Sequence, residues 1–204
     1  MNTTRFITEN DARHIKTLYS INTEQVGHVL TTEEVDILVQ KLTGYLSRGG
    51  VLISMVFDEN ENPLAMYCGF PFPTINGWFV GLTKNISPEN HFNKSAKYMA
   101  PGLDLMIAEM EKRGYYKFWM TAPEKHHNIR NKIMKRHSNL LKRYTWFDEL
   151  VIPQESRSQV QAWEIYRKIC MWSDVTVRMF VLDQEHRVEI LRSQGHQDYK
   201  GTIY

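Results

Sequence analysis

The sequence concentrates its basic side chains between Lys125 and Arg143. This stretch holds seven Lys or Arg residues, three histidines and no acid. Such side chains could attract an anionic ligand, contact a nucleic acid or protein partner, or lie on a helix face exposed to water. A solvated helix face is the simplest of these interpretations. Nucleic acid ranks last, because the stretch lacks the regularly spaced aromatic residues on which single-strand binders stack bases.

The histidines of this stretch do not form a recognisable metal site. His126 and His127 are adjacent, so in an extended segment their side chains point to opposite sides. Neither they nor His137 have a Cys or carboxylate at ligand spacing, so we expect no metal. The sequence also lacks a Walker loop, a nucleophile elbow and a Rossmann fingerprint.

Length and composition predict one globular domain over residues 1–204. The net charge is only +2, and 42% of the residues are hydrophobic, which is ordinary for a globular protein. Cys68 and Cys170 each lie in an apolar stretch and resemble reduced core thiols. We expect a cytoplasmic protein without signal peptide or membrane span, because the N-terminus is polar and no long apolar run exists. Residues 183–204 are expected to form a loose polar tail.

The hydrophobic pattern predicts an α/β protein with a mixed, mostly antiparallel sheet and helices on both faces. Five helices are expected. The first spans residues 11–20, the second follows a capping box at Thr31 and Glu34, and the third ends at Gly114. The fourth follows a cap at Asn128, and the fifth spans residues 156–171. Strands are expected over residues 5–8, 51–58, 63–70, 78–83, 115–121, 144–152 and 175–182.

This order of elements resembles the GCN5-related N-acetyltransferase (GNAT) superfamily. RFITENDARHI is similar to the family's first strand and helix turn, and Trp78 to Met120 is similar to its central strand–loop–helix–strand unit. The resemblance covers residues 5–183. The segments WFDELVIPQ and WSDVTVRMFVL also resemble divergent GNAT-like proteins of tailed bacteriophages.

The resemblance implies acetyl-CoA as cosubstrate and a small-molecule or peptide amine as acceptor. Val80 and Leu82 would offer backbone contacts to the pantetheine, and Asn128 would lie by the CoA arm. The pyrophosphate would bind a loop at a helix N-terminus, where backbone N–H groups favour anions. The loop position falls on Asn93, Lys94, Ser95, Ala96, Lys97 and Tyr98.

That loop departs from the family pattern. Lys94 stands where Arg or Gln is expected, and Ser95 and Lys97 stand where glycines are expected. Two interpretations remain: the phosphates bind through Lys94, Lys97 and the Ser95 hydroxyl, or the cofactor site has been lost.

The family's usual catalytic pair is also not visible. A base must deprotonate the amine and an acid must protonate the departing thiolate. The nearest candidates for the base are loop residues, and each also reads as a solvated side chain. The candidates for the acid are Tyr144 and His137, which also read as packing residues. The four loop candidates for the base are Glu89, His91, Glu124 and His126.

Three hypotheses follow. The first is an acetyl-CoA-dependent N-acetyltransferase, and the second is a catalytically inactive GNAT-like binding module. The third is acyl transfer from an acidic carrier protein docked on the basic stretch between Lys125 and Arg143, which could equally attract the 3′-phosphate of CoA. The sequence leaves the acceptor and the oligomeric state open, with a homodimer among the options.

Overall fold

The computed structural model describes residues 1–20, 31–72, 77–85, 92–123, 127–147 and 175–183, together with Glu189 and Arg192. Its strands form one seven-stranded sheet in the order β1-β2-β3-β4-β5-β7-β6. Only the pairing of β4 with β5 is parallel. The strands are β1 (Thr3–Phe6), β2 (Leu52–Phe57), β3 (Pro63–Phe72), β4 (Gly77–Asn85), β5 (Lys117–Pro123), β6 (Tyr144–Phe147) and β7 (Val175–Leu182).

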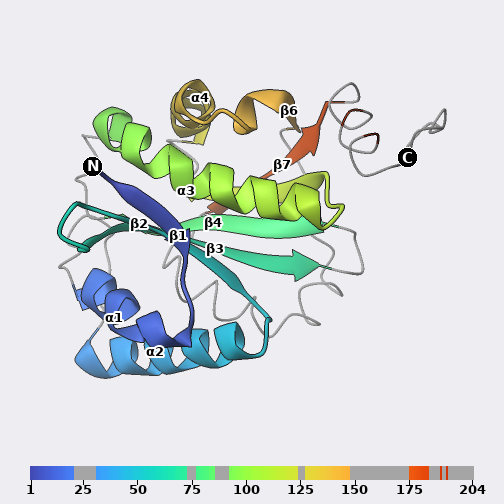
Figure 1. Cartoon of the computed structure of the whole chain (residues 1–204). Coiled ribbons are helices and arrows are strands. Elements are labelled where there is room, and N and C mark those ends of the chain that lie inside the picture. Colours follow the sequence, from blue (N-terminus) through green and yellow to red (C-terminus); the bar gives the residue numbers. More distant parts are fainter. Residues whose placement is uncertain are drawn as a thin grey trace.

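Helices cover both faces of this sheet. The pair α1 (Ala12–Ser20) and α2 (Thr32–Ser47) lies on one face, whereas α3 (Phe92–Lys112) and α4 (His127–His137) lie on the other (Figure 1). This arrangement confirms the mixed, mostly antiparallel α/β architecture expected from the sequence.

The capping box predicted before α2 is present. The Thr31 hydroxyl accepts from the Glu34 backbone N–H at 3.2 Å, and the Glu34 carboxylate accepts from the Thr31 N–H at 2.8 Å. Two otherwise unpaired donors of the helix end are thereby satisfied. The helix then buries Val35, Leu38 and Leu42, which are members of the predicted apolar stripe.

The longest helix, α3, lies close against the sheet. A Cβ placed on Gly102 would stand 3.0 Å from the Tyr67 ring and 3.1 Å from Val56, so only glycine fits without displacing them. The Ser54 hydroxyl donates to the Gly102 carbonyl at 2.8 Å, which satisfies a buried polar group of β2. Most of the core lies between this helix and strands β2 to β5.

The start of α3 differs from the sequence expectation. The polar segment before residue 98 was expected as a loop, but the helix begins at Phe92 and includes Pro101. Ser95, Ala96 and Met99 are buried, so the apolar face of the helix extends toward its N-terminus. Packing of this face outweighs the hydrogen bond that a proline removes inside a helix.

Two further expectations differ or lie outside the described residues. Helix α4 begins at His127, so Asn128 lies in its first turn rather than at the cap. The first strand lies at Thr3–Phe6, and Thr8 instead precedes a short 3₁₀ turn. The predicted helix over residues 156–171, Cys170 and most of the tail lie outside the described residues.

Gly114 provides a test of the end of α3. It has a φ of 81°, the left-handed conformation that the sequence predicted for the residue after this helix. We expect Gly114→Ala to lower the free energy of unfolding by about 1 kcal/mol, because a Cβ is strained there. Gly44→Ala, in the interior of α2, is the matched control and should raise it by a similar amount, about 1 kcal/mol. Urea unfolding of both variants measures this, and equal effects would contradict the assignment.

His14 of α1 is buried in its neutral form. Its ring packs edge-on against Phe57 with centroids 5.0 Å apart, and its Nε2 accepts from Arg13 Nε at 3.4 Å. Burial, followed by the charge of Arg13, lowers the pKa of His14 below 6.5. As pH falls below about 6.5, the unfolded chain therefore takes up this proton more readily than the folded protein, and stability is lost.

We expect His14→Gln to reduce the loss of unfolding free energy between about pH 7 and about pH 5. Asp11→Asn is the control, since Arg5 bonds to Asp11 and lowers its pKa below 3.8, outside that window. Relative to the wild type, the Asp11→Asn control should lose a similar amount of unfolding free energy at both pH values. If the His14→Gln variant loses as much stability as the wild type on acidification, then His14 does not govern this dependence.

Candidate active site

The parallel strands β4 and β5 separate partway along their length. Their ladder pairs Trp78 with Phe118, Phe79 with Trp119, and Val80 with Met120, and then ends. Strand β4 nevertheless continues to Asn85 and β5 to Pro123. Within the described residues, the backbone of both strands beyond this point therefore has no ladder partner across the gap. We call this gap the β4–β5 opening.

Each strand of the opening is held in place from its outer side. β3 pairs with β4 as far as Asn85, with a shift of register where Tyr67 faces Leu82 and Met66 faces Lys84. On the other side, β7 pairs with β5 as far as Pro123. An extra residue in one strand bends that strand, and such bulges recur next to active sites. The bulge in β4 thus lies at the opening.

Two helices begin at the edge where these strands end. Helix α3 follows β4, and α4 follows β5. The first N–H groups of each helix have no partner within the helix, and the helix dipole favours an anion there. The last pair of the ladder, Val80 and Met120, is buried and apolar. The site therefore combines unpaired strand backbone with two helix starts.

The six residues expected to hold a pyrophosphate divide into two groups. In a helix that begins at Phe92, the N–H groups of Asn93 and Lys94 lie outside the helical ladder. Those of Ser95, Ala96, Lys97 and Tyr98 lie within it, so a loop of all six residues is not formed. The side chains of Ser95 and Ala96 are buried toward the sheet.

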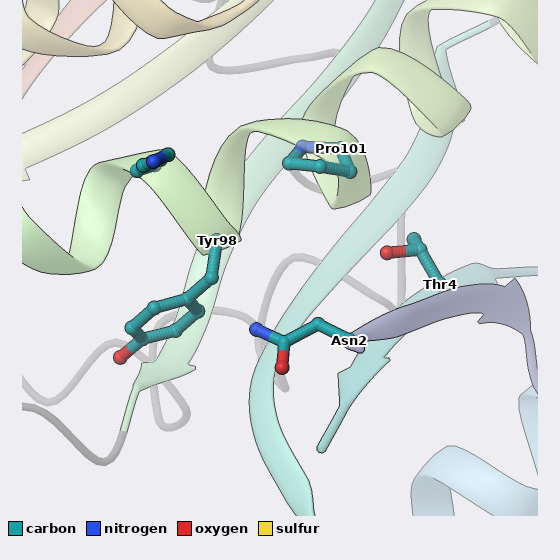
Figure 2. A pocket seen from close by; sticks show the side chains of 5 residues that line it. Asn2, Thr4, Tyr98 and Pro101 are labelled. Carbon is teal, nitrogen blue, oxygen red and sulfur yellow. The ribbon is translucent and has the colours of Figure 1, made fainter. Parts of the chain in front are cut away.

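Lys97 and Tyr98 line a different feature of the surface. Together with Asn2, Thr4 and Pro101 they border a pocket of about 320 Å³. Figure 2 shows Asn2 and Thr4, from the start of the chain and β1, opposite Tyr98 and Pro101 of α3. The pocket lies on the β1 side of α3, away from the β4–β5 opening.

Tyr144 does not reach the opening. Its neighbour in the sheet is Leu182, whose N–H donates to Tyr116 just before β5. The opening begins after Met120, four residues further on, which is about 13 Å along the strand. The Tyr144 hydroxyl instead donates to Glu111 at 2.9 Å. Burial, and then the charge of Glu111, raise the pKa of Tyr144, so it stays protonated.

The contacts of Tyr144 in the structure favour the packing role over the acid role, and its role in catalysis stays a prediction. Glu111, near the end of α3, also accepts two hydrogen bonds of 2.6 Å from Arg143. The ring of Tyr144 packs edge-on against Phe118. This buried cluster joins α3 to β5 and β6. Sequence reasoning missed Glu111, since it lies 33 residues from Tyr144 and reads as an ordinary helix charge.

His137 is the last residue of α4, whereas the opening lies at the start of that helix. Lys135, two residues before the end of α4, donates to the Tyr144 carbonyl at 2.7 Å. None of these side chains is therefore brought to the opening. The four candidate bases in loops, namely Glu89, His91, Glu124 and His126, lie outside the described residues.

A second contact fixes the end of α4. The Asp104 carboxylate of α3 accepts from the Ser138 hydroxyl and from the N–H groups of Asn139 and Leu140, the latter two at 3.0 and 3.1 Å. It thereby caps the turn that follows α4. In the described part of the chain no group of three or more His, Cys, Asp or Glu side chains is arranged for a metal. No helix there is long and apolar enough to span a membrane.

Comparisons with known proteins identify this architecture. No family model matches the chain, and no curated protein matches it in sequence. Among solved structures, a GNAT-family acetyltransferase from Staphylococcus aureus Mu50 has a TM-score of 0.58 at 8% identity and covers 90% of this chain and 100% of its own. The chain therefore has the fold of the GNAT acetyltransferases.

Two other similar structures have more specific names. A chimera of the spermidine N-acetyltransferase SpeG from Vibrio cholerae and hSSAT has a TM-score of 0.54 at 12% identity, covering 93% of this chain and 98% of its own. The ribosomal-protein-S5-alanine acetyltransferase from Vibrio fischeri also has a TM-score of 0.54 at 12% identity, covering 90% and 94%.

The structural role of Tyr144 can be tested by removing its hydroxyl. We expect Tyr144→Phe to lower the free energy of unfolding by about 1 to 2 kcal/mol, because a buried carboxylate loses one donor. Acetyl-CoA affinity, measured by calorimetry, should stay within about twofold of the wild type, since the opening lies elsewhere. Tyr115→Phe is the control, because the Tyr115 hydroxyl makes no hydrogen bond to the described residues. Unchanged stability with impaired binding would contradict the structural role.

Proposed function

We propose that this protein binds acetyl-CoA in the β4–β5 opening and transfers the acetyl group to a primary amine. The observation that carries the proposal is the end of the parallel ladder after Val80 and Met120, at the edge where α3 and α4 begin. An amide-rich arm such as pantetheine needs backbone partners, and unpaired strand groups supply them. A pyrophosphate needs N–H donors, and helix starts supply those.

Each part of the donor then has a place in the chain. The β4 backbone from Val80 to Leu82 would bond the pantetheine amides, and an N–H there would stabilise the oxyanion formed during transfer. The N–H groups of Asn93 and Lys94 would bind the pyrophosphate. Asn128, in the first turn of α4, would lie beside the CoA arm. Ser95, Ala96, Lys97 and Tyr98 would contribute no backbone donors.

The reaction forms a nitrogen–carbon bond while the carbon–sulfur bond of the thioester breaks. The amine must lose a proton to a base, and the departing thiolate must gain one. A water molecule held by backbone carbonyls at the opening can pass the amine proton to solvent. The named neighbours act on spermidine and on a ribosomal protein, which supports an amine acceptor of small-molecule or peptide type.

A second function is supported by a specific observation. Tyr144 and Lys135 are both engaged in structural hydrogen bonds, and His137 lies at the far end of α4. An opening that binds CoA without a nearby proton donor describes a binding module rather than an enzyme. Acetyl-CoA consumption with a panel of polyamines, aminoglycosides and peptide amines separates the two. Turnover above the uncatalysed rate supports the transferase, whereas binding with no turnover supports the module.

Donor binding itself is tested by thermal unfolding and calorimetry. Acetyl-CoA at a hundredfold excess over its Kd should stabilise the protein by about 2.7 kcal/mol. We expect Lys94→Glu to raise the Kd roughly tenfold, because a carboxylate in the first turn of α3 repels the pyrophosphate. Lys41→Glu, exposed on α2 across the sheet, is the control and should bind normally. No thermal shift at millimolar acetyl-CoA would overturn the proposal.

A further inference from the structure

The five cationic side chains described between Lys132 and Arg143 fall into two sets. Arg143 is half-buried and bonds to Glu111, and Lys135 is half-buried and bonds to the Tyr144 carbonyl. The remaining three are exposed and have no ion pair with any described residue. We call this second set the α4 ridge, and it consists of Lys132, Arg136 and Lys142.

The acids described on α3 and at the end of β7 are already engaged by other groups. Asp104 accepts three hydrogen bonds from the turn after α4, and Glu111 is bonded to Arg143 and Tyr144. Asp183, beyond the end of β7, accepts from the Thr145 hydroxyl at 2.7 Å. The stretch from Lys125 to Arg143 contains no acid of its own. Among the residues that the structure describes, no acid therefore pairs with the ridge, on a chain whose net charge is only +2.

Two of the three ridge residues, Lys132 and Arg136, lie on the helix that begins at the β4–β5 opening, and Lys142 lies in the short 3₁₀ turn after it. Helix α4 covers the same face of the sheet as α3 (Figure 1). Lys132 and Arg136 are four residues apart, so they share one face of the helix, and this spacing matches carboxylates four residues apart on an opposing helix. Arg136 lies about 14 Å from the start of α4, too far to contact a phosphate bound at that start.

We propose that the α4 ridge docks an acidic helical carrier protein, whose phosphopantetheine arm delivers the acyl thioester into the β4–β5 opening. This inference rests on the proposed function, because the arm occupies the site assigned there to acetyl-CoA. The reaction is the same: the amine nitrogen gains the acyl carbon, and the thiolate that leaves stays on the arm and takes up a proton.

One observation favours a protein over a nucleic acid, and another favours a carrier over free CoA. The described side chains from Lys132 to Thr145 include no exposed aromatic ring on which a base could stack. Ser95 and Lys97 also stand where the family pattern has glycines, and the exposed Lys97 leaves the backbone less open to a free pyrophosphate than a glycine would. A donor held by protein–protein contacts depends less on that backbone than free CoA does.

The test compares two double variants of the full chain. Arg136→Glu with Lys142→Glu reverses the charge of the two ridge residues that lie farther from the start of α4. Lys41→Glu with Arg48→Glu reverses the same two residue types on α2 and at the cap that follows it, across the sheet, and both of these side chains are exposed. The probes are a bacterial acyl carrier protein bearing acetyl-phosphopantetheine, the same carrier without its arm, and free acetyl-CoA. Affinities are measured by calorimetry at low and high salt.

The proposal expects the acetylated carrier to bind the wild type and the α2 variant equally. It expects the Kd of the ridge variant to rise at least about tenfold, and wild-type binding to weaken with salt. Acetyl-CoA should bind all three proteins alike, and the carrier without its arm should bind more weakly than the acetylated one.

Three outcomes overturn the proposal. One is a carrier that does not bind while acetyl-CoA does, which leaves the proposed function intact. Another is equal carrier binding by the ridge variant and the wild type. The third is an oligonucleotide that binds the wild type more tightly than the carrier and is lost in the ridge variant. Failure of acetyl-CoA and carrier alike would instead reject the proposed function itself.

Discussion

The structure depends on the place where β4 and β5 stop pairing. Two adjacent parallel strands normally satisfy each other's backbone groups along their whole length, and leaving them unpaired inside a protein is costly. Here each strand keeps a ladder on its other side, β4 with β3 and β5 with β7. The outer ladders hold the two strands apart, and the bulge opposite Tyr67 turns β4 away. An opening with free backbone groups is therefore built into the sheet rather than added by a loop.

The far ends of the helices keep this opening in place. Asp104 caps the turn after α4, and Glu111 binds Arg143 and Tyr144 at the start of β6. Both contacts join α3 to the chain beyond α4, so the two helices that begin at the opening are fixed to each other. Within the described residues, the same region engages two polar side chains in structural contacts: Tyr144 donates to Glu111, and Lys135 donates to the Tyr144 carbonyl.

The sequence predicted features that depend on neighbouring residues. The capping box at Thr31 and Glu34, the left-handed Gly114 and the strand pattern each arise from local chemistry, and the structure reproduces them. The start of α3 was predicted incorrectly, because Pro101 and the polar residues before it resemble a loop. Only burial of Ser95, Ala96 and Met99 on the sheet shows that the helix extends further.

The site was harder to predict than the fold, because its key contacts link residues that are distant in sequence. Glu111 and Tyr144 are 33 positions apart, and nothing in either segment marks them as partners. The resemblance therefore offered Tyr144 as an acid, with a packing role as the alternative, and the sequence could not show that its hydroxyl donates to Glu111. The backbone contacts of Val80 and Leu82 to the pantetheine stay predictions. They depend on strand groups that are left unpaired, and no residue type in the sequence marks such groups.

The two positive features of this molecule act over different distances. The partial charge at the start of α3 or α4 stabilises an anion only within the first turn. The α4 ridge acts over roughly a Debye length, about 8 Å at physiological salt. A ligand as small as a pyrophosphate can use the first feature alone. An anionic surface large enough to contact Arg136 and Lys142 while an attached arm reaches the opening uses both, and such a ligand is a macromolecule. The distribution of charge along α4 therefore favours a donor delivered by a protein.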